Sequence, residues 1–218
     1  MIRNWMTKPS FYVCRHGETD LNASTPARYR GWLDIPLNED GLEAAQRVAE
    51  YLSYEKLGMI CCSDLQRCVN TAMELIPLST LPYLDINPNL RPLDIGTFAG
   101  QPKTARNKKA MQHYIDNPDE IIPGSSETVN QFKSRNSAAF CQYACQAASS
   151  AHPLVICCHT SNVTCLYLEG NPDYEAHPEG SDIIGAGGLM AVYVVPSGYE
   201  FEILIGAESE AEGTPTAS

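Results

Sequence analysis

The 218-residue sequence lacks the long hydrophobic run that a membrane-spanning helix needs, and its first ten residues lack the apolar core of a secretory signal. It is also poor in positive charge. Only 15 Lys and Arg stand against 26 Asp and Glu, which gives a formal net charge of −11. This balance disfavours nonspecific binding to nucleic acid or anionic membranes, whereas a small anion responds to the local field of its pocket. We therefore expect a cytoplasmic protein with neither kind of partner.

The nine cysteines include no Cys-x-x-Cys motif, and an odd number cannot complete a disulfide framework. Most of them lie in short apolar runs, so we expect small buried side chains in a reducing compartment. Cys141 and Cys145 share one face of a predicted helix. A zinc site built from them and a distant partner is the alternative, but the spacing favours it less. We predict no metal and no cofactor.

The length favours a single domain, predicted over residues 1–206, followed by an acidic and disordered tail at 207–218. Four apolar runs rich in strand-forming residues are predicted strands: 11–14, 59–62, 83–86 and 154–158. Segments with helical spacing alternate with them: 38–52, 63–74, a helix that starts at Pro102, and 127–149. Two last runs, 189–195 and 200–205, predict a hairpin. This alternation is typical of an α/β three-layer sandwich, with a mostly parallel central sheet flanked by helices on both faces.

The run 11–14 ends abruptly in Arg15-His16-Gly17, which places a cation and an imidazole at the carboxyl end of a strand. Open α/β sheets bind ligands at that end. Gly17 permits a sharp turn and close approach to a ligand, Arg15 offers a planar set of donors for phosphate, and His16 suits a nucleophile or proton carrier. The alternative is a surface turn that carries these residues without a function.

His159 follows the strand 154–158 just as His16 follows the first strand, and two histidines at matching strand ends favour a shared site. Arg67 falls in the first turn of the helix that follows the strand 59–62. The position makes convergence with Arg15 plausible, although an exposed helical arginine is the simpler interpretation of this residue taken alone. The loop 20–36 is long, as expected beside an active site.

Five segments resemble, in order, the motifs of the histidine phosphatase superfamily, also called the phosphoglycerate mutase-like family. They are 15–19 (RHGET) with Asn22, 30–37 (RGWLDIPL) with Gly41, 63–67 (SDLQR) with Thr71-Ala72, 90–96 (LRPLDIG) with Gly100, and 154–159 (LVICCH). Together they cover roughly residues 11 to 205. The resemblance implies a metal-independent enzyme that transfers a phosphoryl group through a phosphohistidine.

The resemblance also implies roles for individual residues. His16 is the nucleophile, and His159 assists it by holding the phosphoryl oxygens. The residues implied in phosphate binding are Arg15, Arg67, Asn22, Gly17 and Thr160.

The proton donor is where this sequence departs from the family. Members with a Leu-x-Glu pattern use that Glu as the acid, and the matching residue here is Pro92. Asp94 lies two residues further on, and an extended chain would point it to the same side. Glu127 is the second candidate acid. A structural role for Asp94, in which it caps the turn before Gly96, carries equal weight.

Three functions follow from this pattern. The favoured one is a phosphomonoester hydrolase for a small phosphorylated metabolite. A phosphoglycerate mutase-type transfer is less favoured, because the segment between Gly100 and Pro123 is short and has no adjacent arginines. The third is a catalytically weak regulatory module that binds phosphate, which Pro92 supports. The sequence leaves the substrate and the oligomeric state open, a homodimer included.

Four cations in an otherwise acidic chain form a cluster: Lys103, Arg106, Lys108 and Lys109. Part of this cluster is predicted to face the mouth of the pocket, where it would favour substrates with a second anionic group. A solvated helix face is an equally good interpretation.

Overall fold

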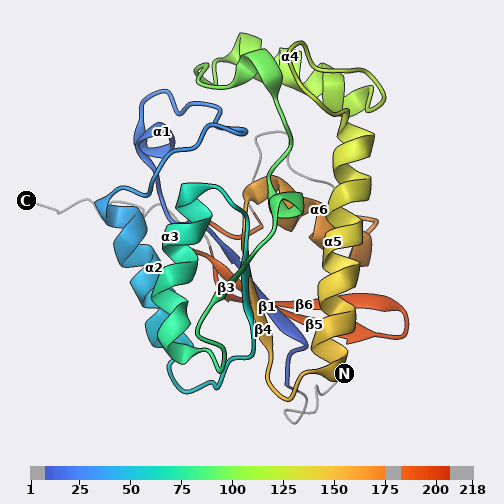
Figure 1. Cartoon of the computed structure of the whole chain (residues 1–218). Helices are drawn as coiled ribbons and strands as arrows, with labels where there is room; N and C mark the ends of the chain where they lie inside the picture. Colours follow the sequence, from blue (N-terminus) through green and yellow to red (C-terminus); the bar gives the residue numbers. More distant parts are fainter. Residues whose placement is uncertain (1–7, 175–182, 207–218) are drawn as a thin grey trace, which may run out of the picture.

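The computed structural model describes residues 8–174 and 183–206 (Figure 1), so the predicted tail at 207–218 lies outside the described residues. The strands in this part of the chain are β1 (Phe11–Arg15), β2 (Ile60–Cys62), β3 (Leu84–Ile86), β4 (Leu154–Cys158), β5 (Leu189–Val195) and β6 (Gly198–Ile205). The α-helices are α1 (Asp20–Ala23), α2 (Glu39–Tyr51), α3 (Gln66–Leu75), α4 (Ala105–Asp116), α5 (Val129–Ser149) and α6 (Thr160–Gly170). None of these helices is long and apolar enough to cross a bilayer.

The strands form one sheet in the order β3-β2-β4-β1-β5-β6. The pairs β2/β3, β2/β4 and β1/β4 are parallel, whereas β1/β5 and β5/β6 are antiparallel. The predicted terminal hairpin is therefore β5 and β6. Because β1 and β4 are adjacent and parallel, their carboxyl ends meet at one edge of the sheet, as the two strand-end histidines require.

Two hydrophobic layers enclose the sheet because side chains alternate along each strand. In β1, Phe11 and Val13 point into the layer that contains α5 and α6. Tyr12 and Cys14 point into the layer that contains α2 and α3. Figure 1 shows these two pairs of helices on opposite faces of the strands, which confirms the predicted three-layer sandwich.

The cysteines predicted to be buried all lie within these layers: Cys14, Cys61, Cys62, Cys157 and Cys158. They are free thiols, and burial raises the pKa of Cys62 to about 12, so that side chain stays protonated. Cys141 and Cys145 are exposed on α5. Within residues 8–174 and 183–206, no group of three or more His, Cys, Asp or Glu side chains is arranged to hold a metal ion.

Side-chain caps decide where several helices begin. Asn38 accepts a hydrogen bond from the Gly41 amide at the start of α2, and Thr128 caps α5 with Gln131 in a reciprocal capping box. The prediction that a helix starts at Pro102 is wrong by one turn. Thr104 accepts from the Asn107 amide, so α4 begins at Ala105.

A third, smaller hydrophobic cluster supports the segment that covers the carboxyl edge of the sheet. It contains Leu93, Ile95, Met111, Ile122, Val129 and Phe132. These residues pack the loop after β3 against α4 and the start of α5, which Figure 1 places beyond the ends of the central strands. The cluster thus provides one wall for a site at the carboxyl ends of β1 and β4.

Candidate active site

His16 lies directly beyond β1 and is almost fully buried, with 1% of its surface exposed. Its backbone amide donates to the Cys158 carbonyl at 3.0 Å, so the hydrogen bonding to β4 continues through this residue. Its ring Nδ1 lies 2.6 Å from the Gly17 carbonyl. That oxygen can only accept, so Nδ1 carries the proton and Nε2 presents a lone pair. The backbone therefore fixes the tautomer that a phosphate-accepting histidine needs.

Gly17 is required for packing between β1 and α2. A Cβ atom at this position would collide with the backbone of Gly41 at the start of α2. Its amide donates to Thr71 Oγ1 on α3 at 3.1 Å. The sequence predicted Gly17 as a phosphate-binding residue, and the structure places its N–H on α3 instead. This contact holds the loop after His16 between the two helices.

His159 faces His16 across the ends of the two strands, with 5.2 Å between the ring centroids. Arg67 Nε donates to His159 Nδ1 at 3.3 Å, which leaves the proton of a neutral His159 on Nε2. The guanidinium of Arg67 also donates to the carbonyls of Leu33 and Gly31, at 2.7 and 2.8 Å. One buried arginine thus orients the second histidine and holds the loop above it.

Positive charge surrounds both histidines. Burial lowers the pKa of His16 well below its usual value, and His159, Arg30, Arg67 and Arg15 lower it further. Burial and the same arginines, Arg67 first, also lower the pKa of His159. Arg15 itself is 3% exposed and donates to the Ile184 carbonyl at 3.1 Å. The free site therefore contains neutral imidazoles in a positive field, which suits an attack on an anionic phosphoryl group.

This field has a measurable consequence for the pH dependence. Protonation of His16 Nε2 would occupy the lone pair that attacks phosphorus. Because the pKa of His16 is lowered, this loss of activity should occur only at a more acidic pH. We expect kcat/KM, which reports the free enzyme, to stay level as the pH falls through about 6.5, the usual pKa of histidine. The rates need correction for the phosphate itself, whose second pKa is about 6. A corrected pH–rate profile with a midpoint at or above the usual value would contradict the neutral-histidine assignment.

A pocket of about 120 Å³ opens above the two rings. It is lined by His16, Tyr29, Arg30, Gly31, Arg67, Pro92, Leu93, Ile95, Lys103, His159, Thr160 and Ser161. The volume is small beside the roughly 300–1,000 Å³ of typical small-molecule sites. A phosphoryl group fits inside, and the rest of a substrate must then lie against the mouth.

Several lining residues had no predicted role. Arg30 and Tyr29 belong to the loop that the sequence placed near the site, but only the structure brings their side chains to the two histidines. Lys103 also lines the pocket, with its Nζ 5.5 Å from the centre of the Tyr29 ring. Part of the basic cluster therefore does face the pocket, as predicted. The other three cations, Arg106, Lys108 and Lys109, are exposed on α4 and do not line the pocket.

Thr160 lies in the pocket wall at the first position of α6. The amides at a helix N-terminus attract anions, and His159 is the residue that precedes this helix. Asn22 is placed differently. Its side-chain oxygen accepts from the backbone and hydroxyl of Thr19 at the start of α1, and Asn22 does not line the pocket. Its amide NH₂ is the group it would offer to a phosphate.

The two predicted acids lie together, behind the pocket wall. Asp94 accepts from the Gly96 amide at 3.1 Å and from the amide and hydroxyl of Ser126, both at 2.8 Å. The turn-capping alternative for Asp94 is therefore confirmed. Glu127 pairs with Arg135 at 2.7 Å and accepts from the Asp94 amide at 3.1 Å. Neither carboxyl lines the pocket, and no Asp or Glu is among the described residues that do.

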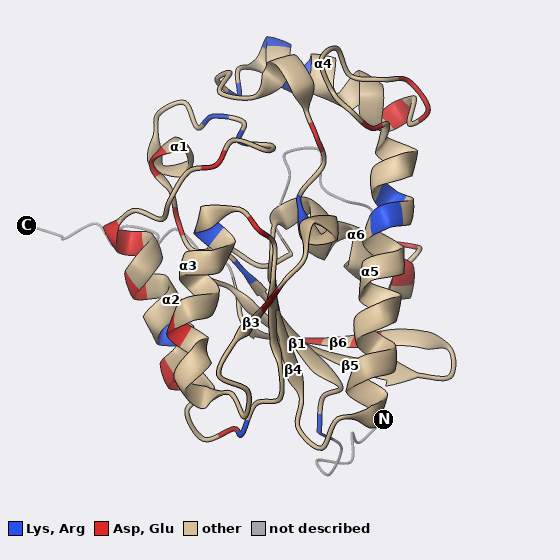
Figure 2. Cartoon of the chain, viewed as in Figure 1, with Lys and Arg blue, Asp and Glu red and all other residues tan. Residues whose placement is uncertain are grey.

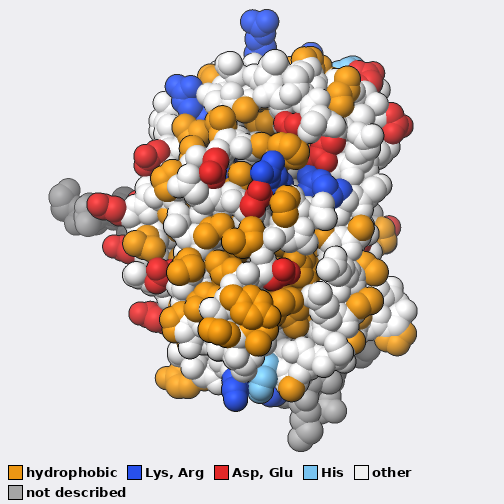
Figure 3. Space-filling model, viewed as in Figure 1, with side chains coloured by type: hydrophobic (Ala, Val, Ile, Leu, Met, Phe, Trp, Pro, Cys, Tyr) orange, Lys and Arg blue, Asp and Glu red, His pale blue; other side chains and the backbone are white. Residues whose placement is uncertain are grey.

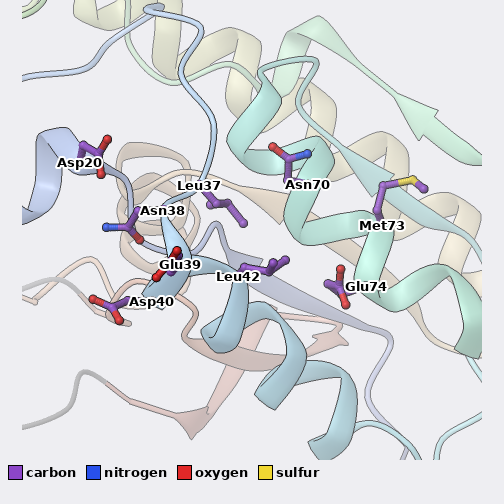
Figure 4. Close-up of a pocket in the computed structure, with 9 residues that line it drawn as sticks. All are labelled: Asp20, Leu37, Asn38, Glu39, Asp40, Leu42, Asn70, Met73 and Glu74. Carbon is purple, nitrogen blue, oxygen red and sulfur yellow. The ribbon is translucent and has the colours of Figure 1, made fainter.

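A larger hollow of about 770 Å³ lies elsewhere, between α1, α2 and α3 (Figure 4). Four carboxylates border it: Asp20, Glu39, Asp40 and Glu74. No Lys, Arg or His is among its lining residues, so this hollow would repel a phosphorylated molecule. The chemistry therefore points to the smaller pocket.

The chain is similar to known proteins with names of the phosphoglycerate mutase and phosphatase type. Phosphoglycerate mutase-like protein 4 of Arabidopsis thaliana is 30% identical over 168 residues, which cover 73% of this chain and 70% of that protein. A metal-independent phosphoserine phosphatase of the same plant is 27% identical over 161 residues, which cover 72% of this chain and 66% of the relative. In fold, a mycobacterial glucosyl-3-phosphoglycerate phosphatase solved in complex with VO3 superposes with a TM-score of 0.71 at 19% identity, covering 91% of this chain and 99% of that one.

The match to a family model covers most of the described chain. Residues 11–174 fit the model of the histidine phosphatase superfamily (branch 1). This range begins with β1 and includes both histidines and Arg67. The chain therefore belongs to the histidine phosphatase superfamily.

Proposed function

We propose that this protein is a phosphomonoester hydrolase that acts on a small phosphorylated metabolite through a phosphohistidine on His16. The observation that carries the proposal is the hydrogen bond from His16 Nδ1 to the Gly17 carbonyl, which leaves Nε2 as the nucleophile in a ring whose centroid lies 5.2 Å from that of His159. Relatives named as phosphatases of phosphoserine and of glucosyl-3-phosphoglycerate support the reaction class.

The reaction has two steps. In the first, His16 Nε2 forms a bond to phosphorus while the bond from phosphorus to the substrate oxygen breaks. Charge on the phosphoryl oxygens is stabilised by Arg67, by the His159 ring and by the amides at the start of α6, while Arg15 adds to the positive field. In the second, water attacks phosphorus, the bond to Nε2 breaks, and inorganic phosphate leaves. Every positive group used here is a side chain or an amide, so the proposed mechanism is independent of metal.

The direct test is release of inorganic phosphate by the purified protein from an aryl phosphate and from a panel of phosphorylated metabolites. The active protein should release phosphate, and His16→Ala should not. Binding of phosphate without turnover by the unmodified chain would instead support the regulatory module.

A phosphoryl transferase of the mutase type is the second candidate, because relatives named as phosphoglycerate mutases match this chain. The two functions differ in the final acceptor of the phosphoryl group. Label that is recovered as inorganic phosphate supports the hydrolase, whereas label that moves to a second hydroxyl of a phosphoglycerate supports the mutase.

We expect Lys103→Gln to weaken binding of substrates that carry a second anionic group. Lys103 lies at the pocket mouth, where the part of the substrate that does not fit must rest. A single ion pair in a partly exposed setting is worth about 0.2–1 kcal/mol, so KM should rise by about 1.4- to fivefold. The KM of a simple aryl phosphate should change less.

Lys108→Gln is the matched control, because Lys108 is an exposed lysine on the neighbouring helix that does not line the pocket. It should leave both KM values unchanged. An equal effect of Lys103→Gln on both substrates, or an effect of Lys108→Gln as large as that of Lys103→Gln, would show that the cluster acts only through its overall charge.

A further inference from the structure

One pair of buried polar side chains has no part in the proposed reaction. Asn136 on α5 and Asn162 on α6 are both 0% exposed. Asn162 Nδ2 donates to Asn136 Oδ1 at 2.8 Å, and Asn136 Nδ2 donates in return to the Asn162 carbonyl at 3.4 Å. We call these two residues the asparagine pair. Burial of a carboxamide is costly unless its hydrogen bonds are made, so the pair favours one arrangement of the two helices.

Asn162 also caps the start of α6. Its Oδ1 accepts a hydrogen bond from the backbone N–H of His159 at 3.3 Å, at the point where β4 ends. A side chain at the third position of a helix that reaches back in this way fixes the entry of the chain into the helix. Residues 154–168 contain no Asp, Glu, Lys or Arg (Figure 2), so neutral groups must hold this segment. The cap therefore sets where the His159 ring and the first amides of α6 lie.

The third hydrogen bond of the Asn162 side chain reaches the wall of the pocket. Nδ2 also donates to the Arg91 carbonyl at 3.2 Å, and the next residue, Pro92, lines the pocket. The neighbouring Ser161 Oγ accepts from the Leu93 amide at 3.3 Å, so two bonds join the start of α6 to this wall. One buried carboxamide thus connects the start of α6, on the phosphate side of the pocket, with the wall at Pro92.

Charged side chains hold the same wall from its outer side. Arg91 pairs with Asp64 at 2.6 Å. Arg135 pairs with Glu127 at 2.7 Å and donates to the Arg91 carbonyl at 3.0 Å. Figure 3 shows basic and acidic side chains next to one another on this face of the molecule. These charged groups join the wall to α5 and to the loop before α3, whereas Asn162 joins it to α6.

We propose that Asn162, held by Asn136, is a positioning residue for the reaction. It sets the distance from the His159 ring and the first amides of α6 to the wall at Pro92. This inference rests on the proposed hydrolase function. Asn162 does not line the pocket and so acts through the groups that it holds. A catalytic group displaced by about 1 Å can cost about 10²-fold in rate, whereas binding of phosphate depends mainly on positive charges that stay in place.

The test compares kcat for an aryl phosphate with the inhibition constant of inorganic phosphate, well below the melting temperature of each variant. Asn162→Ala should lower kcat by about 10²-fold and change the inhibition constant by less than about threefold. Asn136→Ala removes only the anchor on α5, so kcat should fall less, by about tenfold. If Asn162→Ala does not fold, Asn136→Ala decides the question by the same two measurements.

Asn171→Ala is the matched control. Asn171 lies at the other end of α6, where its Nδ2 donates to the Tyr167 carbonyl at 3.0 Å. The control should lower the melting temperature without changing kcat or the inhibition constant. An unchanged kcat in Asn162→Ala would overturn the inference, as would equal changes in kcat and in the inhibition constant, or an equal loss of kcat in Asn171→Ala. An unmodified chain without turnover would instead refute the proposed hydrolase, and this inference with it.

Discussion

His16→Ala is expected to abolish hydrolysis of every phosphomonoester substrate. Loss of the nucleophile in a covalent hydrolase costs on the order of 10⁶ in kcat. Among the described residues that line the pocket, only His16 is a buried imidazole whose tautomer is fixed by a backbone carbonyl, so no other side chain can replace it as the nucleophile. Rapid quench with labelled substrate should trap an acid-labile, base-stable phosphoprotein in the unmodified chain and none in His16→Ala.

His152→Ala provides the matched control. His152 lies just before β4, whereas His159 follows the other end of that strand. The substitution therefore removes an imidazole from the same strand without changing a residue that lines the pocket. Its turnover should equal that of the unmodified chain. Activity of His16→Ala within tenfold of the unmodified chain would show that another group accepts the phosphoryl group.

The fold and the centre of the site could be predicted because both depend on local patterns. Apolar runs that end in Arg15-His16-Gly17 and in His159 specify strands with histidines at their ends, and parallel pairing of β1 with β4 then brings the rings together. Arg67 reaches the same point because its helix starts directly after β2. The α6 helix was not predicted, since its start follows a strand without any turn residue between them.

The rest of the site depends on contacts between loops that are far apart in the sequence. Trp32 Nε1 donates to the Pro92 carbonyl at 2.8 Å, and Arg91 lies 4.8 Å from the centre of the Trp32 ring. Arg91 also pairs with Asp64 at 2.6 Å. These bonds fix the wall at Pro92, yet no spacing in the sequence specifies which loops meet. Arg30 reached the pocket unpredicted for the same reason.

The missing acid leads to the second expected result. The unmodified chain should hydrolyse an aryl phosphate about 10²–10⁴ times faster than an alkyl phosphate, the usual contribution of a general acid. A phenolate with a low pKa leaves without a proton, whereas an alkoxide needs one. The sequence resemblance predicts Pro92 at the position of the family's acid, and no carboxyl is found among the described lining residues. The measurement that checks this ratio is kcat/KM across a series of leaving groups with increasing pKa.

Asp94→Asn and Glu127→Gln decide whether either carboxyl supplies that proton. Asp94 caps a turn through three donors, and Glu127 is paired with Arg135, so we expect each substitution to loosen the wall beside Pro92. A loosened wall should slow aryl and alkyl phosphates by the same factor and leave the slope of the leaving-group series unchanged. If Asp94→Asn slows only the alkyl phosphate, Asp94 reaches the leaving group during turnover and is the acid. The same selective loss in Glu127→Gln would assign that role to Glu127, because the loss of a general acid slows poor leaving groups more than good ones.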